Sequence, residues 1–258
     1  MFKENRLKRR MAAGERAFGI WLQTAEPTFA ELAGLVGYDV LILDNEHGPA
    51  DLQRSVEMMR AAEAAGADVL VRVPWNDPVY LKRILDAGAA SLMIPMVESA
   101  EEARAAVAAC RYPPRGSRGY SASTARASSY GLVKDYLARA DDELFIAVQI
   151  ESEAAVGRAG EIAAVEGVDM VFIGPNDLAG SIGLLERLHE PAVDRLIRRC
   201  EQAVRGVGKS LGTVPRPEHG PERLLTEAYQ LVAASTEMTL FREAARAEIA
   251  RVKAAIGK

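Results

Sequence analysis

Short apolar runs recur along the chain, and the gaps between them hold segments whose apolar residues repeat with helical spacing. Segments 51–65, 78–87 and 99–110 are of this helical type. Because parallel strands must be joined by long crossovers that usually contain a helix, the alternation predicts an α/β fold with a parallel sheet. The eight runs cover residues 17–23, 39–43, 68–71, 91–97, 145–150, 170–173, 210–214 and 230–235.

Eight strands of this kind predict a (β/α)8 barrel, that is, a TIM barrel, formed by residues 1–258 as a single domain. Residues 40–43 and 171–173 are apolar without alternation, as in strands buried on both faces. A doubly wound open sheet is the alternative fold. It is disfavoured because no Gly-x-Gly-x-x-Gly turn follows the first run. The last segment, residues 240–256, is expected to add a C-terminal amphipathic helix.

Composition excludes several classes of partner. The formal charge of −4 and the pI near 5.6 provide no basic field for nucleic acid. The basic segment 3–10 lacks the apolar core of a signal peptide and is expected to be a solvated helix. No run approaches the roughly 18 apolar residues of a membrane span. Cys110 and Cys200 lie outside any paired motif, so we expect reduced thiols and a cytoplasmic protein.

Polar and charged residues stand where several predicted strands end. The segment 44–47, Asp-Asn-Glu-His, follows the second run, and Arg72 follows the third. Glu151 and Asp177 follow the fifth and sixth. A parallel barrel collects the carboxyl ends of its strands at one mouth, so these residues are expected to converge on one substrate. The pattern therefore indicates an enzyme.

Glu151 and Asp177 suggest a metal site. Carboxylates that end neighbouring strands can share a hard divalent cation and leave positions open for water and substrate. The alternative is that each carboxylate caps the helix that follows it. Gly174 and Pro175 precede Asp177 and favour the metal, because a small, rigid turn exposes backbone amides to a close ligand.

Three further residues are candidates for proton transfer or charge stabilisation. His47 is one of three histidines and the only one just past a strand end, although a hydrogen-bonded loop histidine is the alternative. Arg72 leaves an apolar layer, so an acidic side chain or an anionic ligand must face it. A structural ion pair with Asp44 would also satisfy it. Asp86 closes a predicted helix, where the dipole disfavours negative charge, but ordinary surface placement explains it as well.

Several motifs, in order along the chain, resemble the HpcH/HpaI class II pyruvate aldolases, which act on hydroxy-ketoacids and 2-keto-3-deoxy sugar acids. The resemblance covers roughly residues 15–250. Its motifs are Gly19-Ile20-Trp21-Leu22, Asp44-Asn45-Glu46-His47-Gly48-Pro49, Val71-Arg72-Val73-Pro74-Trp75-Asn76-Asp77-Pro78, Ile94-Pro95-Met96-Val97, the segment from Arg111 to Gly119, Val148-Gln149-Ile150-Glu151 and Phe172-Ile173-Gly174-Pro175-Asn176-Asp177-Leu178.

The resemblance implies a (β/α)8 barrel and a divalent cation, Mg²⁺, Mn²⁺ or Co²⁺, held by Glu151 and Asp177. It implies reversible aldol cleavage of 4-hydroxy-2-oxo acids to pyruvate and an aldehyde through a metal-bound pyruvate enolate. The roles that it implies are His47 as the base, Asp86 as the carboxylate that raises its basicity, Arg72 as stabiliser of the enolate, and Trp21, Gln149, Asn176 and Asp177 as substrate contacts, with Asp44 in support.

Alternative chemistry is less well supported by the residues. The seven lysines lie outside the predicted catalytic strand ends, which argues against a Schiff base, and no His-x-x-x-His pair exists for a zinc site. A lyase acting on citryl- or malyl-coenzyme A shares the barrel, but no added basic segment for coenzyme A is evident. A non-catalytic barrel that binds small acids would be distinguished by failure to exchange pyruvate protons.

The chain departs from commoner relatives at two loops. Segments 213–217 and 234–237 lack the Gly- and Asp-containing ends expected there, and they are predicted to line the aldehyde side of the site.

Relatives form hexamers that exchange the last helix, and the apolar stripe within residues 240–256 predicts a homo-oligomer here. The alternative is that this stripe covers the chain's own barrel. Residues 113–120 are expected to form an exposed turn at the rim of a neighbouring site.

Overall fold

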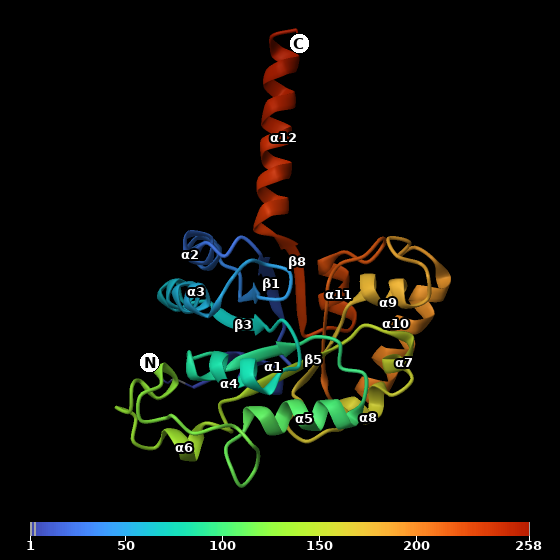
Figure 1. Ribbon diagram of the computed structural model, residues 1–258. Coiled ribbons are helices and arrows are strands. Elements are labelled where there is room, and N and C mark those ends of the chain that lie inside the picture. The colour runs from blue at the N-terminus through green and yellow to red at the C-terminus, as the bar shows by residue number, and fades with distance from the viewer. Residues whose placement is uncertain (1, 3, 258) are drawn as a thin grey trace.

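The computed structural model describes residues 2 and 4–257 and shows a closed barrel of eight parallel strands. Each strand pairs with the next along the chain, and the first pairs with the last (Figure 1). All eight predicted strands are confirmed, and the open-sheet alternative is wrong. The strands are β1 (Ala17–Leu22), β2 (Val40–Asp44), β3 (Asp68–Arg72), β4 (Ser91–Ile94), β5 (Phe145–Ile150), β6 (Met170–Ile173), β7 (Ser210–Thr213) and β8 (Leu231–Thr236).

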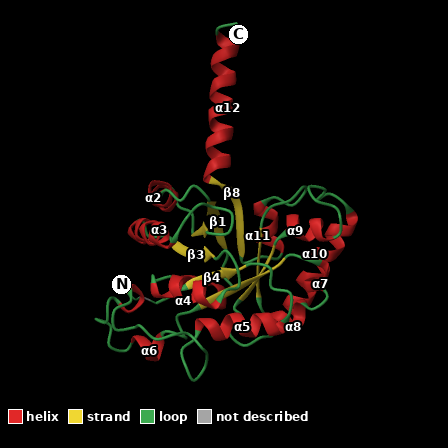
Figure 2. Cartoon of the chain, in the orientation of Figure 1, coloured by secondary structure: helices red, strands yellow, loops and turns green. Residues whose placement is uncertain are grey.

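Helices surround the strands (Figure 2). Several begin where the sequence supplies a capping side chain, such as Asp51, Asp77 or Ser99, which accepts a hydrogen bond from a backbone N–H of the first turn. The helices are α1 (Arg6–Ala12), α2 (Pro27–Leu35), α3 (Leu52–Ala64), α4 (Pro78–Asp86), α5 (Ala100–Cys110), α6 (Tyr136–Arg139), α7 (Glu153–Val156), α8 (Ala159–Ala163), α9 (Pro175–Ser181), α10 (Pro191–Gly206), α11 (Pro221–Glu227) and α12 (Glu237–Ala255), with one 3-10 turn, η1 (Arg126–Ser128).

The core has two layers because successive residues of a strand face opposite sides. In β2, Val40 and Ile42 belong to the cluster inside the barrel, while Leu41 and Leu43 pack between strands and helices. Both sets are fully buried. This is why the sequence of β2 is continuously apolar rather than alternating.

The basic N-terminal segment forms the predicted helix, but one side of this helix is buried against the barrel. Leu7 and Met11 of α1 are buried in the same cluster as the residues inside the barrel, so this helix closes the end of the barrel where the strands begin. Its exposed side carries the charges, and Arg10 pairs with Asp39 at 2.6 Å. The helix was expected, but its buried face was not. Lys3, where the predicted segment begins, lies outside the described residues.

Helix α12 extends away from the barrel as a lone rod (Figure 1). Thr236 caps it by accepting a hydrogen bond from the N–H of Thr239 at 2.9 Å. The predicted C-terminal helix is confirmed, but the suggestion that its apolar stripe covers the chain's own barrel is wrong. Its large apolar side chains are exposed: Met238, Leu240, Phe241, Ile249 and Val252, followed by Ile256. No helix among the described residues is long and apolar enough to cross a membrane.

Candidate active site

The carboxyl ends of the strands enclose a cavity of about 360 Å³. Its lining brings together most of the residues that the sequence singles out, and they come from β1, β2, β3, β5, β6, β7, β8 and the loops that follow them. Among the lining residues are Trp21, His47, Arg72, Gln149, Glu151, Asn176 and Asp177. Three predicted site residues do not line the cavity: Asp44 and Glu46, which lie beside Arg72, and Asp86, which lies elsewhere.

Arg72 is held in one orientation by Asp44. Its Nε donates to Asp44 Oδ1 at 2.9 Å and its Nη2 to Asp44 Oδ2 at 2.7 Å, so the pair is bidentate. The guanidinium lies 4.4 Å from the ring centre of Trp21 and is 3.0 Å from Glu46 Oε2 through Nη1. The predicted ion pair with Asp44 is therefore present, and Arg72 also lines the cavity, while its role in the reaction stays a prediction.

The two acids beside Arg72 have opposite pKa shifts. Burial would raise the pKa of Asp44, but the hydrogen bonds and charge of Arg72, with that from Gln23, hold it below its ordinary value. Burial raises the pKa of Glu46, and the attraction of Arg72 only partly opposes this. Of the two, Asp44 beneath Arg72 is therefore the acid that more readily stays ionised, and Glu46 is the acid more ready to take up a proton.

Glu151 lies at the bottom of the cavity and is 4% exposed. Gln149 donates from Nε2 to Glu151 Oε1 at 2.9 Å, and the backbone N–H of Met96 donates to Oε2 at 3.1 Å. Met96 has φ 53°, a left-handed conformation that is uncommon for a non-glycine residue and that accompanies this contact. A Cβ at Gly174 would lie 2.5 Å from Glu151 Oε1, so only glycine leaves room for the carboxylate.

Glu151 and Asp177 fit a divalent cation by donor chemistry. Burial, together with the nearby charges of Glu46 and Asp177, raises the pKa of Glu151 to about 7. A cation would relieve this repulsion. The side-chain Oε1 of Gln149 is buried with no hydrogen-bond partner, which leaves a further oxygen available. The described residues contain no group of three or more His, Cys, Asp or Glu able to hold a metal, so water and substrate oxygens would complete the shell.

His47 and Asp86 are not brought together within one chain. The His47 side chain is 61% exposed at the mouth of the cavity, and among the described residues the one carboxylate within 4.0 Å of its ring is Glu46, at 3.9 Å. Asp86 ends α4, close to where β4 begins, and therefore lies at the opposite end of the barrel. There it forms an ion pair with Arg118 at 2.6 Å. A dyad of His47 and Asp86 requires two copies of the chain.

The two loops that depart from commoner relatives lie against the cavity in part. Val214 and Pro215 after β7 line it, as do residues 234–236 of β8, so parts of both segments reach the cavity; that they form its aldehyde side stays a prediction. Arg216 does not line the cavity, and its side chain is 5% exposed and faces Asp194. Arg118 of the predicted rim turn is also buried, with its guanidinium 4.4 Å from the ring centre of Tyr112, so that turn is only partly exposed.

A profile of the HpcH/HpaI aldolase/citrate lyase family matches residues 17–244. The chain belongs to this family. Hydroxypyruvate/pyruvate aldolase from Agrobacterium fabrum is 42% identical over 250 residues, which cover 97% of this chain and 94% of that relative. 5-keto-4-deoxy-D-glucarate aldolase from Enterobacter sp. is 40% identical over 240 residues, 93% of each chain. A solved HpcH/HpaI family protein from Burkholderia cenocepacia has a TM-score of 0.92 and 34% identity, with 96% and 99% of the two chains covered.

These comparisons confirm the predicted family, the barrel and an aldolase-type lyase. They also fit the site, because an HpcH/HpaI aldolase needs its polar groups at the carboxyl ends of the strands, where this chain places them.

Two residues of this HpcH/HpaI chain make contacts that the sequence did not predict. The sequence placed Gln23 at the end of the first strand and Glu237 in the aldehyde-side segment 234–237, but Glu237 does not line the cavity. Gln23 follows β1 and donates from Nε2 to Asp44 Oδ2 at 2.7 Å, so it belongs to the support of Arg72. Glu237, the first residue of α12, is 5% exposed and accepts hydrogen bonds from the loop that contains Gln23. The sequence could have identified both residues, because each is a polar residue at the end of a strand, and that criterion identified Arg72 and Glu151.

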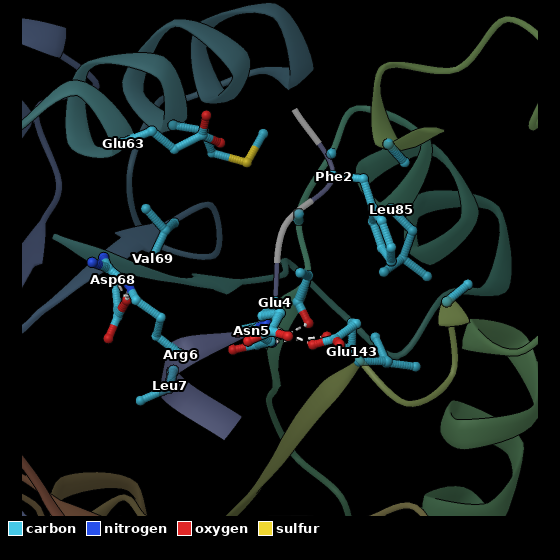
Figure 3. A pocket seen from close by; sticks show the side chains of 18 of the residues that line it. Phe2, Glu4, Asn5, Arg6, Leu7, Glu63, Asp68, Val69, Leu85 and Glu143 are labelled. Atoms are coloured by element: carbon cyan, nitrogen blue, oxygen red, sulfur yellow. Dashed lines mark hydrogen bonds and ion pairs between the residues drawn. The ribbon is translucent and has the colours of Figure 1, made fainter. Parts of the chain in front are cut away.

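A second cavity, of about 260 Å³, lies at the opposite end of the barrel beneath the N-terminal segment (Figure 3). Charged residues of its lining pair with one another, Arg6 with Asp68 at 2.8 Å and Arg126 with Glu63 at 3.2 Å. In addition, the backbone N–H of Asn5 donates to Glu143 Oε2 at 2.6 Å. The contacts of Arg6 and Asn5 attach the N-terminal segment to the barrel. Glu151, Asp177, Arg72 and His47, to which the resemblance assigns roles in the reaction, lie at the other end.

Proposed function

We propose that this protein is a metal-dependent aldolase that cleaves 4-hydroxy-2-oxo acids to pyruvate and an aldehyde, and that residues 1–258 act as one domain. The observation that carries the proposal is the convergence of Glu151, Asp177, Arg72 and His47 on one cavity. Relatives named as aldolases of oxo acids, at about 40% identity over most of both chains, support the same class of substrate.

Glu151 and Asp177 would hold Mg²⁺, Mn²⁺ or Co²⁺. When bound, the cation supplies a positive charge that stabilises the developing oxyanion of the substrate. Gln149, with an unpartnered buried Oε1, and the backbone of Asn176 in the first turn of α9 would orient the pyruvate portion. Trp21, which packs edge-to-face on Phe172 at 5.7 Å, provides a rigid apolar wall beside it.

Arg72 and His47 would perform the steps that depend on protein side chains. The Arg72 fork is already oriented by Asp44, so it donates to the oxygen that gains charge without further reorganisation. His47 is exposed at the mouth, where it can take the proton from the 4-hydroxyl during cleavage and return a proton to C3 of pyruvate.

We also propose that the working unit is a homo-oligomer, a hexamer by the resemblance. The apolar side chains of α12 are exposed along the rod, with Phe241 69% exposed, and a second copy of the chain is the partner that would cover them. Assembly would also bring Asp86 of one copy to His47 of another. The two cysteines are buried, free thiols, in agreement with the cytoplasmic location that we propose.

The decisive experiment follows deuterium incorporation into the methyl group of pyruvate by NMR. Protein stripped with a chelator should be inactive, and Mg²⁺, Mn²⁺ or Co²⁺ should restore exchange. Adding a panel of aldehydes should then give 4-hydroxy-2-oxo acids. Full exchange in metal-free protein would remove the metal from the proposal. Metal and pyruvate binding without exchange would instead identify a barrel that only binds small acids.

A further inference from the structure

We propose that Glu237 is a positioning residue for Arg72, acting through the loop after β1 and the side chain of Gln23. The inference rests on the proposed aldolase function for its kinetic readout. Glu237 does not itself line the cavity, and no hydrogen bond or ion pair joins it to Arg72 among the described residues, so its effect on the reaction would be indirect, through the lining residue Gln23.

The carboxylate of Glu237 holds the loop by one oxygen. Its Oε1 accepts hydrogen bonds from the backbone N–H of Gln23 at 2.7 Å, the backbone N–H of Thr24 at 2.6 Å and the Thr24 hydroxyl at 2.8 Å. Hydrogen bonds to a carboxylate are roughly twice as strong as neutral ones. Without this acceptor, two backbone N–H groups beside the active site would lose their partner.

The same loop is linked to Arg72 through the side chain of Gln23 and the carboxylate of Asp44. The backbone of Gln23 is held by Glu237, and its side chain donates to Asp44 Oδ2, the oxygen that also accepts from Arg72 Nη2. Every link is a hydrogen bond of 2.6–2.8 Å. The orientation of the Arg72 fork therefore depends on where α12 begins.

Helix capping does not explain Glu237. The cap of α12 is Thr236, whose hydroxyl accepts from the N–H of Thr239. The carboxylate of Glu237 turns instead to a different segment of the chain, more than 200 positions earlier in the sequence. A buried acid that leaves its own helix to hold a loop of the active site points to a positioning role.

The test combines Glu237→Ala, Glu237→Gln and Gln23→Ala in the metal-loaded, full-length protein. Because a displacement of about 1 Å can cost on the order of 100-fold in rate, we expect Glu237→Ala to slow pyruvate proton exchange by about 10- to 100-fold with little change in the KM for pyruvate. Glu237→Gln keeps an acceptor oxygen and should retain most of the rate. In a Gln23→Ala background, Glu237→Ala should add little, because the link is already broken.

Glu243→Ala is the matched control. Glu243 lies on the same helix but is exposed, and the one ion pair that it forms among the described residues is with its neighbour Arg242, so its loss should leave the rate unchanged. Multiplicative effects of the Gln23 and Glu237 variants would overturn the proposal. A rate loss that follows a fall in oligomer mass would overturn it as well.

A spectroscopic readout separates this inference from the proposed function. In a Trp75→Phe background Trp21 is the sole tryptophan, and it lies against Arg72. Displacing the guanidinium in Glu237→Ala should change Trp21 fluorescence even if the wild type proves inactive with pyruvate. An unchanged Trp21 spectrum would contradict the positioning role, whereas an inactive wild type with an altered spectrum would contradict only the aldolase assignment.

Discussion

Arg72 carries its charge into a buried position, and the residues around it make this possible. Its side chain is 9% exposed, and Asp44, Glu46 and the Trp21 ring surround the guanidinium. The sequence predicted that an acid or an anion must face this arginine. It did not predict that Asp44 would accept two parallel hydrogen bonds, because the register that aligns Asp44 with Arg72 is a property of the paired strands β2 and β3.

Arg72→Lys should damage catalysis far more than folding. Lysine retains the charge but cannot make the planar fork with Asp44 and still reach the substrate. Losing one positioned donor to an oxyanion costs about 3 kcal/mol, on the order of 100-fold in rate, so pyruvate proton exchange should fall by about that factor. Arg126→Lys, at the far end of the barrel where Arg126 pairs with Glu63, is the control. Near-normal exchange by Arg72→Lys would refute the assigned role.

Glu151 destabilises the metal-free fold at neutral pH. Its pKa rises from 4.5 to about 7 because of burial and of the acids around it. The folded state therefore binds this proton more tightly than the unfolded state, so the contribution of Glu151 to the free energy of unfolding is largest below pH 4.5 and is lost as the pH rises through 7. A shift of this size corresponds to about 3 kcal/mol.

Glu151→Gln should remove that cost and stabilise the metal-free protein at pH 8 by up to about 3 kcal/mol, with little change at pH 4. The amide of Gln149 can rotate so that its free Oε1 accepts from the new side chain. Denaturant unfolding in the presence of a chelator measures the effect. Glu143→Gln is a control with the opposite sign. The hydrogen bond from Arg9 lowers the pKa of Glu143, so this substitution should lower, not raise, the free energy of unfolding at pH 8. Equal stability of wild type and Glu151→Gln at pH 8 would contradict the raised pKa.

At the scale of elements, strands were predictable because both core layers demand apolar side chains. Runs such as 145–150 and 170–173 coincide with β5 and β6 as observed. Strand ends were less certain: the run 91–97 extends beyond β4, which ends at Ile94 because Met96 turns into a left-handed conformation. Pro95 indicates that the strand stops there, but a methionine gives no sign of the left-handed conformation at position 96. The buried face of α1 was also missed, because two apolar residues among many basic ones resemble a solvated helix.

Leu7→Ala should destabilise the protein by about 3 kcal/mol, because Leu7 is 1% exposed and its loss leaves a cavity beneath the barrel. Leu132→Ala is the matched control, since Leu132 is 76% exposed, and its effect should stay within about 0.5 kcal/mol. Denaturant unfolding at constant pH provides the comparison. If the two variants unfold alike, α1 does not close the barrel as described.

At the scale of the whole molecule, one chain holds most of the site but separates two of its predicted members. The sequence placed His47 and Asp86 in one mechanism, through the resemblance alone. The direction of α4 decides their separation. His47 lies at the mouth of the barrel, whereas α4 runs from the mouth to the other end and has Asp86 as its last residue. No periodicity within one chain encodes a contact between copies, so this part of the site was beyond what residue patterns can predict.

Mixing two inactive variants tests whether copies share the site. His47→Ala and Asp86→Asn should each lose most activity alone. When they are co-expressed with different tags and purified as mixed oligomers, about one quarter of the sites should receive an intact His47 from one copy and an intact Asp86 from another, and activity should return to about that fraction of wild type. Asp86→Asn leaves Arg118, which is 5% exposed, without its charge partner, so Asp86→Asn with Arg118→Met serves as a second form if the single variant folds poorly. As a control, light scattering must show the same mass for the mixed oligomers and for the wild-type protein. Restored mass without restored activity would rule out a shared dyad, and a monomer with full activity would rule out the assembly itself.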